Sequence, residues 1–317
     1  MFVRRADGNF DWNKAESWER ILGTSDYPNN PDDVVMIYGE FSGDRTINLK
    51  EDITIGYLGV GDLSTNDRKV TLGSSGSLTF KTSDGTASWI RLPGKISNPW
   101  IAFNRPVSME NDLVIDGMCG EKMLIDFSST LTVNEHRLSA TRVEWYGGGA
   151  EFTDGQFRLY GDVIGSGIIE IYANTLMTHR NVNTKSFTGT WKIMNGPHEG
   201  NYGGAGLFLG GTYLYNAKEL IIGGAWMSNK ERRLGANVQT GWHNGYQYGA
   251  TTNEWKNVFP SHIILDGGLL QLLNEGPLGG ASYNAYVATG IREDYLETDT
   301  LEISSGPMGS LVSKVAK

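Results

Sequence analysis

Short apolar segments separated by turn-forming residues recur along most of the chain, and this spacing constrains the fold more than any other feature of the sequence. As far as residue 172 they recur about every 8 to 12 residues, and within them apolar residues alternate with polar ones or form short runs. Gly, Asn, Asp and Ser between the segments favour turns. Only residues 12–22 show helical periodicity, which predicts one short amphipathic helix. The pattern predicts an all-β protein.

Pairs of apolar segments joined by a small-residue corner form a repeated unit. Examples are "KVTLGSSGSLTF" (69–80), "VEWYGGGAEFTDGQFRLYG" (143–161) and "HIILDGGLLQLL" (262–273). The chain has 42 glycines but only 9 prolines, so its corners are built mainly with glycine. Since glycine tolerates sharp backbone bends, the unit predicts a strand that turns a corner and continues as a second strand.

Three all-β architectures compete for this pattern. A sandwich needs about seven to nine strands per domain of about 100 residues, with Greek-key returns. A propeller needs a period of about 40 to 50 residues and a blade motif, and the sequence has neither. A parallel β-helix needs loosely repeated coils of roughly 20 to 30 residues with apolar inward positions. The sequence therefore favours a right-handed parallel β-helix of about ten coils, a solenoid roughly 50 Å long at the usual strand spacing.

The first coil of such a solenoid would expose apolar cross-section and unpaired strand edges, so its end must be covered. Trp12 and Trp18, followed by the loop "SDYPNNPDD", stand directly before the first clear strand. We therefore expect residues 1–32 to form an N-terminal cap and residues 33–317 to form one β-helix domain. The alternative interpretation is that the two tryptophans stack on a sugar.

Charge and composition exclude several classes of function. The formal net charge is −9, from 27 basic and 36 acidic residues, which argues against nucleic acid as a partner. The single cysteine, Cys119, cannot form a disulfide within the chain. No apolar run is long enough for a membrane span, and the first residues, "MFVRRADGNF", lack the apolar stretch of a signal peptide.

The start of the chain resembles the initial motif of extracellular β-helix proteins of the autotransporter-passenger type and of bacteriophage tail fibres and spikes. The matching pieces are "DWNKAESWERI", with its two tryptophans, and "YPNNPDDVVMI". Later pieces, "NTKSFTGTWKIMNG", "RRLGANV" and "HIILDGGLLQLL", resemble the repeat of those passengers. The resemblance covers about a third of the chain and describes a fold rather than a chemistry. It implies a structural role outside the cell.

Two departures from the passenger pattern bear on that role. A passenger is expected to follow a signal peptide and to precede a C-terminal translocator barrel. The sequence shows neither of these two elements. A virion protein needs neither, because it assembles in the cytoplasm and is released by lysis. We therefore expect location in a virion, with an extracellular or cell-surface location as the alternative.

Motifs for catalysis and cofactors are missing from the sequence. It has no phosphate-binding loop and no nucleophile elbow, and its five histidines lack zinc-ligand spacing. We expect no metal and no cofactor. β-Helix hydrolases need two carboxylates at a fixed separation, and the sequence offers too many pairs to choose among them: Asp112/Asp116, Glu151/Asp154 and Asp162/Glu170.

Residues 224–260 interrupt the strand rhythm and are predicted to form a long loop insertion. Long loops on rigid scaffolds often carry function. Aromatic rings with polar neighbours suit either packing against another subunit or contact with a sugar face. The candidate contact residues in this segment are Trp226, Trp242, His243, Tyr246, Tyr248 and Trp255.

These observations predict a non-enzymatic structural subunit of an extracellular assembly, such as a phage fibre, spike or decoration protein. Its expected partners are copies of itself or other virion or surface proteins, and the segment 224–260 is a candidate contact for host-surface polysaccharide. Two alternatives stay open. One is a polysaccharide lyase or glycoside hydrolase of the β-helix class, which requires acids beside Arg or Lys along one face. The other is a bacterial adhesin or passenger domain.

Overall fold

The structure is a computed structural model in which nearly all regular structure is β-strand. The residues that it describes are 1–62, 68–92, 100–117, 124–141, 157–172, 176–180, 186–194, 206–210, 214, 216–223, 227–229, 232–234, 237–243, 246–248, 262–266, 269–275, 282–288 and 310–313.

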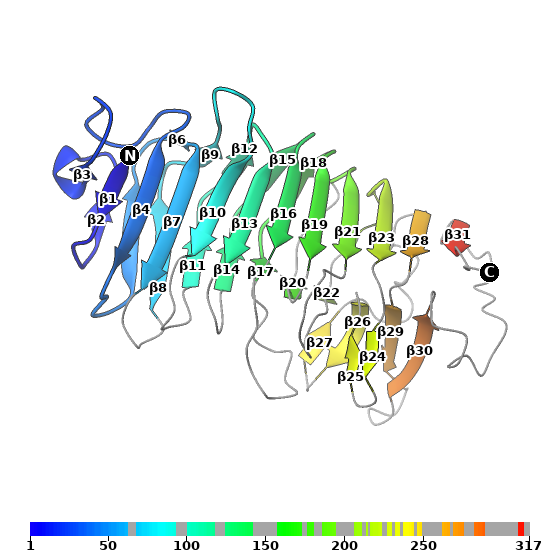
Figure 1. Ribbon diagram of the computed structural model, residues 1–317. Coiled ribbons are helices and arrows are strands. Elements are labelled where there is room, and N and C mark those ends of the chain that lie inside the picture. The colour runs from blue at the N-terminus through cyan, green and yellow to red at the C-terminus, as the bar shows by residue number, and fades with distance from the viewer. Residues whose placement is uncertain are drawn as a thin grey trace.

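Two long sheets run along the molecule, and both are mainly parallel (Figure 1). Sheet A has 12 strands in the order β3 (Glu19–Arg20), β1 (Phe2–Arg4), β4 (Val34–Gly39), β7 (Tyr57–Asp62), β10 (Ser88–Leu92), β13 (Leu113–Gly117), β16 (Arg137–Thr141), β19 (Ile168–Tyr172), β21 (Thr190–Met194), β23 (Glu219–Gly223), β28 (His262–Asp266) and β31 (Ser310–Ser313).

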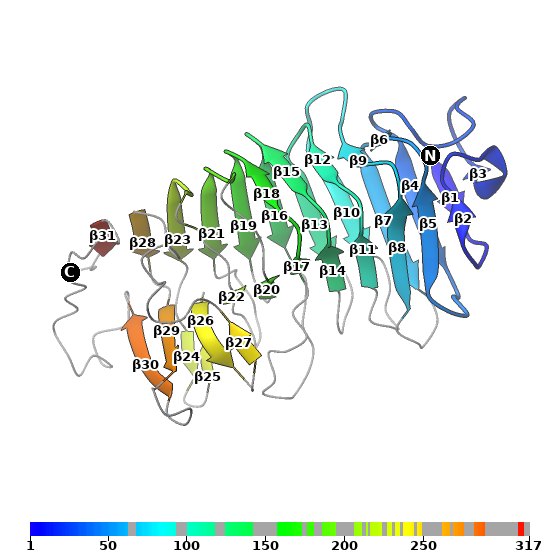
Figure 2. The same ribbon diagram turned by 180° about the vertical axis from the view of Figure 1, so that it is seen from behind.

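Sheet B also has 12 strands, and Figure 2 shows the molecule turned by 180° so that it is seen from behind. Its order is β2 (Phe10–Asp11), β5 (Arg45–Leu49), β8 (Lys69–Ser74), β11 (Trp100–Phe103), β14 (Leu124–Phe127), β17 (Phe157–Leu159), β20 (Leu176–Arg180), β22 (Gly206–Gly210), β26 (Asn237–His243), β29 (Leu269–Glu275) and β30 (Ser282–Ala288), with β27 (Tyr246–Tyr248) paired to β26.

A third, five-stranded sheet C completes the cross-section over the first half of the molecule. It contains β6 (Ile53–Ile55), β9 (Leu78–Phe80), β12 (Val107–Met109), β15 (Leu131–Asn134) and β18 (Val163–Gly165). The remaining pair, β24 (Met227–Asn229) and β25 (Arg232–Leu234), forms an antiparallel ribbon.

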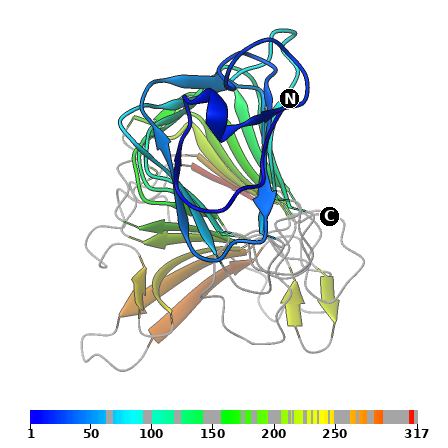
Figure 3. The ribbon, with the colours of Figure 1, turned by 90° about the vertical axis from the view of Figure 1, so that its left-hand side faces the viewer.

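The chain visits the three sheets in turn, which makes the molecule a parallel β-solenoid. β4, β5 and β6 lie in sheets A, B and C, and β7, β8 and β9 repeat that order one layer further along. Viewed along the stack, the N-terminal coil lies in front and the later coils follow behind it (Figure 3). Contacts between neighbouring coils join residues at unequal separations in the sequence, for example 25, 29 and 32 positions. The all-β solenoid predicted from the strand spacing is confirmed.

The core is a set of stacked apolar columns inside the coils. In sheet C one column contains Ile53, Leu78, Val107, Leu131 and Val163, which are aligned by register and at most 1 % exposed. A strand such as β5 therefore buries every second residue. Burying one such side chain contributes about 1.5–3 kcal/mol, so the stack of columns is the main source of stability.

Glycine corners bring successive coils into close backbone contact. A Cβ atom on Gly76 would collide with the carbonyl oxygen of Glu51, and one on Gly167 would collide with that of His136. The same holds for Gly161 and Gly189, against the carbonyl oxygens of Ser129 and Gly167. These four corners explain part of the glycine richness, since any larger residue would force two coils apart.

Asp and Asn side chains at other corners bind the next coil. The Oδ1 atom of Asn29 accepts a hydrogen bond from the Thr54 N–H (2.7 Å), and Asp52 Oδ1 accepts one from the Ser77 N–H (2.9 Å). Asp112 does the same for the Arg137 N–H at 2.8 Å. Each contact joins residues 25 positions apart. In each one the carboxylate or amide oxygen satisfies a backbone N–H where the hydrogen bonding between strands is interrupted.

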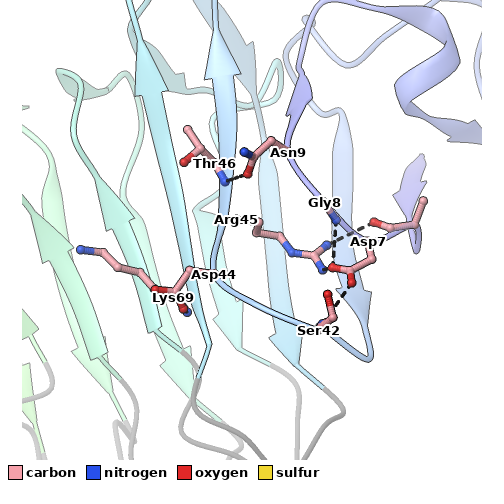
Figure 4. A network of polar contacts seen from close by, with 9 residues as sticks. Asp7, Gly8, Asn9, Ser42, Asp44, Arg45, Thr46 and Lys69 are labelled. Carbon is pink, nitrogen blue, oxygen red and sulfur yellow. Dashed lines mark hydrogen bonds and ion pairs between the residues drawn. The ribbon is translucent and has the colours of Figure 1, made fainter.

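One corner near the N-terminus contains a buried guanidinium (Figure 4). The Arg45 side chain donates from Nη2 to Asp7 Oδ1 (2.5 Å) and lies over the Phe41 ring, with Cζ 3.2 Å from the ring centroid. Asp7 also accepts hydrogen bonds from the backbone N–H groups of Gly8 (2.8 Å) and Ser42 (3.1 Å). These contacts hold the segment before β2 against the next coil.

The corner carboxylates make the fold sensitive to acid. Hydrogen bonds from Ser42, Lys50, Ser77 and Thr86 lower the pKa values of Asp7, Asp11, Asp52 and Asp84 respectively. A carboxyl group whose pKa is lower in the folded than in the unfolded chain stabilises the fold above its unfolded pKa of about 3.9, and that contribution is lost as the pH falls through the folded value.

We therefore expect the free energy of unfolding to be insensitive to these groups between about pH 5 and 7 and to fall below about pH 4. Unfolding by guanidinium chloride at several pH values measures this free energy. The Asp52→Asn variant is expected to lose less stability than the wild type as the pH falls below about 4. A stability that rises toward pH 3 would contradict the assignment.

The N-terminal segment folds differently from the predicted helix. Only Ala15–Ser17 (η1) is helical, as a 3₁₀ turn, and its flanking residues Lys14 and Trp18 have extended backbone. The helix prediction for residues 12–22 was wrong because the Trp12 N–H bonds to the Asn48 carbonyl (3.0 Å), which extends the hydrogen bonding between β2 and β5.

The two predicted cap tryptophans are both buried. Trp12 is 0 % and Trp18 8 % exposed, and their ring centroids are 4.9 Å apart in an edge-to-face arrangement. The Trp12 Nε1–H donates to the carbonyl of Pro28 (2.7 Å), and the Trp18 Nε1–H donates to that of Trp12 (2.6 Å). This accounts for the proline loop, since one of its carbonyls satisfies a buried indole. Rings buried in this way are not available to stack on a sugar.

Candidate functional site

Four of the six candidate contact residues lie on one antiparallel ribbon. β26 pairs with β27 so that Trp242 is opposite Gln247, His243 is opposite Tyr246, and Gly241 is opposite Tyr248. Trp226 and Trp255 lie outside the described residues. The segment 224–260, predicted as a loop insertion, contains β24 to β27, and β26 also pairs in parallel with β22 and β29. Part of this segment therefore continues sheet B.

A second group of polar side chains, which the sequence did not single out as a set, lies on the outer face of sheet A. We call it the outer charged strip. It crosses β16, β19, β21, β23 and β28, and its members are Arg137, Glu170, Thr190, Lys192, Glu219 and His262.

Glu170 is at the centre of one half of the strip. Its side chain points outward, because its neighbours Ile169 and Ile171 are buried in the core, yet Glu170 is only 2 % exposed. Arg137 Nη1 lies 3.0 Å from Glu170 Oε2, and Lys192 Nζ lies 4.0 Å from it. The two cations come from the strands on either side, so they cover the carboxylate and leave their own side chains partly exposed.

Glu219 is at the centre of the other half. Its Oε1 accepts a hydrogen bond from the Thr190 hydroxyl (3.0 Å), and His262 Nδ1 lies 3.4 Å from its Oε2. Lys218 Nζ is 3.9 Å from Oε1. Register explains the arrangement, because Thr190 is paired with Glu219 across neighbouring strands.

The strip therefore combines two shielded carboxylates with Arg, Lys and His groups along one face of the solenoid. Glycoside hydrolysis uses two carboxyl groups, and a side chain placed beside ionised neighbours can act in general acid–base catalysis. The same arrangement also stabilises a sheet face by pairing opposite charges on adjacent strands. In both interpretations the strip consists of two groups, one around Glu170 and one around Glu219.

The acidic pairs considered from the sequence are not brought together in this way. Glu151 and Asp154 lie outside the described residues. Asp112 is used at a corner, where it binds a backbone N–H. Asp162 is exposed on the loop before β18, whereas Glu170 lies on β19. Only Glu170 of these residues belongs to the outer charged strip.

Among the residues whose positions are described, no group of three or more His, Cys, Asp or Glu side chains could hold a metal ion. In the same part of the chain, no helix has the length and apolar character needed to cross a membrane. Comparisons with protein-family models, with curated proteins and with solved structures gave no match.

Proposed function

We propose that this protein is a non-enzymatic structural subunit of an extracellular assembly, most simply a phage fibre, spike or decoration protein. The observation that carries the proposal is the difference between the two ends of sheet A. At one end β3 has two residues, both charged, whereas at the other end β31 has the uncharged sequence Ser-Leu-Val-Ser and pairs only with β28 among the described strands. Charged short edges discourage pairing with other chains, and uncharged edges favour it.

The proposal includes a right-handed winding and an N-terminal cap formed by residues 1–32. Connections between parallel strands of one sheet are right-handed in about 98 % of cases. Trp12 and Trp18 belong to the same buried cluster as the first coils, and the Arg20 guanidinium donates to the carbonyls of Thr24 (2.9 Å) and Ser25 (3.1 Å) beside the edge strand. These contacts support a closed N-terminal end.

The partners in this proposal are copies of the chain or other proteins of the virion or cell surface. Host-surface polysaccharide is a further partner, and the residues Trp226, Trp242, His243, Tyr246, Tyr248 and Trp255 are its proposed contacts. The pairing of β26 with β27 supports this in part, since it places four of the six within one ribbon.

The test is the mass of the purified protein in solution, measured by light scattering over a dilution series. A trimer or larger species that persists on dilution is the expected result. A monomer at every concentration would overturn the assembly proposal.

A polysaccharide-degrading enzyme is the second candidate, because the outer charged strip is the arrangement of acids beside Arg and Lys that this class requires. In that case Glu170→Gln is expected to abolish release of reducing ends or unsaturated sugars from acidic and neutral polysaccharides, while the circular dichroism spectrum stays unchanged. Ser139→Ala, a change on the neighbouring strand in register with Glu170, is the control. Absence of any product from the wild-type protein would eliminate this candidate for the polymers tested.

A further inference from the structure

The outer face of sheet B carries a cluster built on one nearly buried carboxylate. Asp126 on β14 is 4 % exposed and accepts hydrogen bonds from the Trp100 Nε1–H (2.8 Å) on β11. It also accepts two hydrogen bonds from the Arg158 guanidinium on β17, from Nε (2.5 Å) and Nη2 (2.8 Å). A bidentate ion pair of this kind fixes both geometry and orientation. Asp126 therefore holds an indole and a guanidinium in defined positions on the surface.

The indole lies across the strands rather than standing apart from the sheet. Trp100 comes from β11, but its N–H reaches the next strand, β14. Ala102, the next outward position on β11, is 0 % exposed, so side chains lie over it. Trp100 itself is half-buried and so is in contact with solvent.

Two cations flank this ring. The Lys69 ammonium on β8 lies 4.2 Å from the Trp100 ring centroid, and the Arg158 Cζ atom lies 5.2 Å from it. Arg158 is also 5.7 Å from the ring centroid of Tyr160. Lys and Arg side chains only donate hydrogen bonds, so these two partly exposed cations beside the indole favour a ligand rich in acceptors. The indole adds an apolar surface suited to the C–H groups of a sugar ring.

We propose that Lys69, Trp100, Asp126, Arg158 and Tyr160, here called the sheet B aromatic cluster, bind a polysaccharide that contains uronic acid. Trp100 contacts a sugar ring, and Lys69 and Arg158 donate to its carboxylate and hydroxyl groups. Asp126 is a positioning residue, because its acceptor atoms are used by Trp100 and Arg158.

The sheet B aromatic cluster is elongated along the axis of the solenoid. Four of its members come from β8, β11, β14 and β17, which are neighbouring strands of sheet B, and Tyr160 directly follows β17. At about 4.8 Å between strands, it extends for roughly 14 Å along the solenoid. This length suits a short stretch of polymer lying parallel to the axis. The inference rests on the glycan-contact part of the proposed function, and it places that contact on sheet B in addition to the ribbon of β26 and β27.

The test is electrophoresis of the native protein through gels that contain polygalacturonate or, for comparison, dextran of the same chain length. Polygalacturonate is expected to retard the wild type and dextran is not. Trp100→Ala is expected to raise the dissociation constant about tenfold, corresponding to about 1.4 kcal/mol. Trp89→Ala is the matched control, since Trp89 is also half-buried but lies on sheet A beside Tyr57 and Arg91, and it should leave retardation unchanged.

A second pair of variants separates contact from positioning. Lys69→Gln should weaken binding and reduce its dependence on salt concentration, because one ion pair with the polymer is removed. Asp126→Asn should weaken binding and also shift the fluorescence emission of the protein, as it changes the acceptor of the Trp100 indole.

The outcomes distinguish this inference from the broader proposal. Retardation that survives both Trp100→Ala and Lys69→Gln would place the glycan contact elsewhere and overturn the sheet B cluster alone. Equal retardation by dextran would overturn its preference for acidic polymers. Absence of retardation in the wild type would overturn binding to this class of ligand, while the assembly proposal would still depend on the solution mass.

Discussion

Replacing Gly167 with alanine is expected to lower the free energy of unfolding by about 3 kcal/mol, at the upper end of the cost of overpacking. The added Cβ would meet the backbone of His136 and Glu135 in the preceding coil, and Gly189 in the following coil lies against the Gly167 carbonyl. Backbone atoms on both sides cannot move without disturbing the pairing of β16 with β19. Guanidinium unfolding followed by circular dichroism measures the change.

Gly43→Ala is the matched control for this prediction. A Cβ at Gly43 would meet nothing within 4 Å, and its φ is not in the left-handed region. We expect the control to be neutral or to stabilise the protein by less than about 1 kcal/mol, through the reduced entropy of the unfolded chain. Equal stability of the Gly167 and Gly43 variants would show that the coils are not in contact at this corner.

Replacing Trp12 with alanine is expected to cost about 3–5 kcal/mol, the usual range for removing a large buried aromatic side chain. The change would remove the edge-to-face contact with Trp18 and leave the Pro28 carbonyl without its indole donor. It would also open a cavity against the first coil. We expect the variant to unfold at lower denaturant concentration and to aggregate when partly unfolded, because the end of the sheets becomes accessible.

Two comparisons make the Trp12 prediction specific. Trp12→Phe keeps most of the apolar volume but lacks the indole N–H, so it should cost less than the alanine variant. Trp89→Ala removes a half-buried tryptophan from the outer face of sheet A and should cost much less. An alanine variant at Trp12 that is as stable as the one at Trp89 would contradict the role given to the N-terminal segment.

Two kinds of strand are well predicted from the sequence, namely those in which apolar and polar residues alternate and those formed by a short apolar run. The segment "RTINL" corresponds to β5 and "WIAF" to β11, residue for residue. β7 was missed because Gly59 and Gly61 weaken its strand pattern. In the structure the Met36 side chain of the preceding coil occupies the space beside Gly59 that a Cβ would fill. A side chain of one coil thus fills the space beside a glycine of the next coil, and this cannot be predicted without knowing the register.

The outer charged strip and the sheet B aromatic cluster were hidden for a related reason. Glu170 is paired with Lys192 in register, but the coils differ in length, so no fixed interval in the sequence aligns one with the other. Asp126 and Arg158 are 32 residues apart, whereas Asp112 and the Arg137 N–H are 25 apart. The aromatic candidates in 224–260 were found from composition alone. Their side-chain contacts stay a prediction.

The corner contacts have a consequence for how such a chain can change in length. Because each coil is fixed to its neighbours by backbone-to-glycine contact and by Asp or Asn acceptors, a deletion that removes part of a coil shifts every later inward residue out of its column. Removal or duplication of one whole turn would preserve those columns. Extra residues between strands can instead be accommodated outside the stack, because paired residues in neighbouring coils are already separated by as few as 20 and as many as 48 positions. Evolution or engineering can thus adjust the rod in discrete steps of one layer, about 4.8 Å each, while connecting segments vary freely.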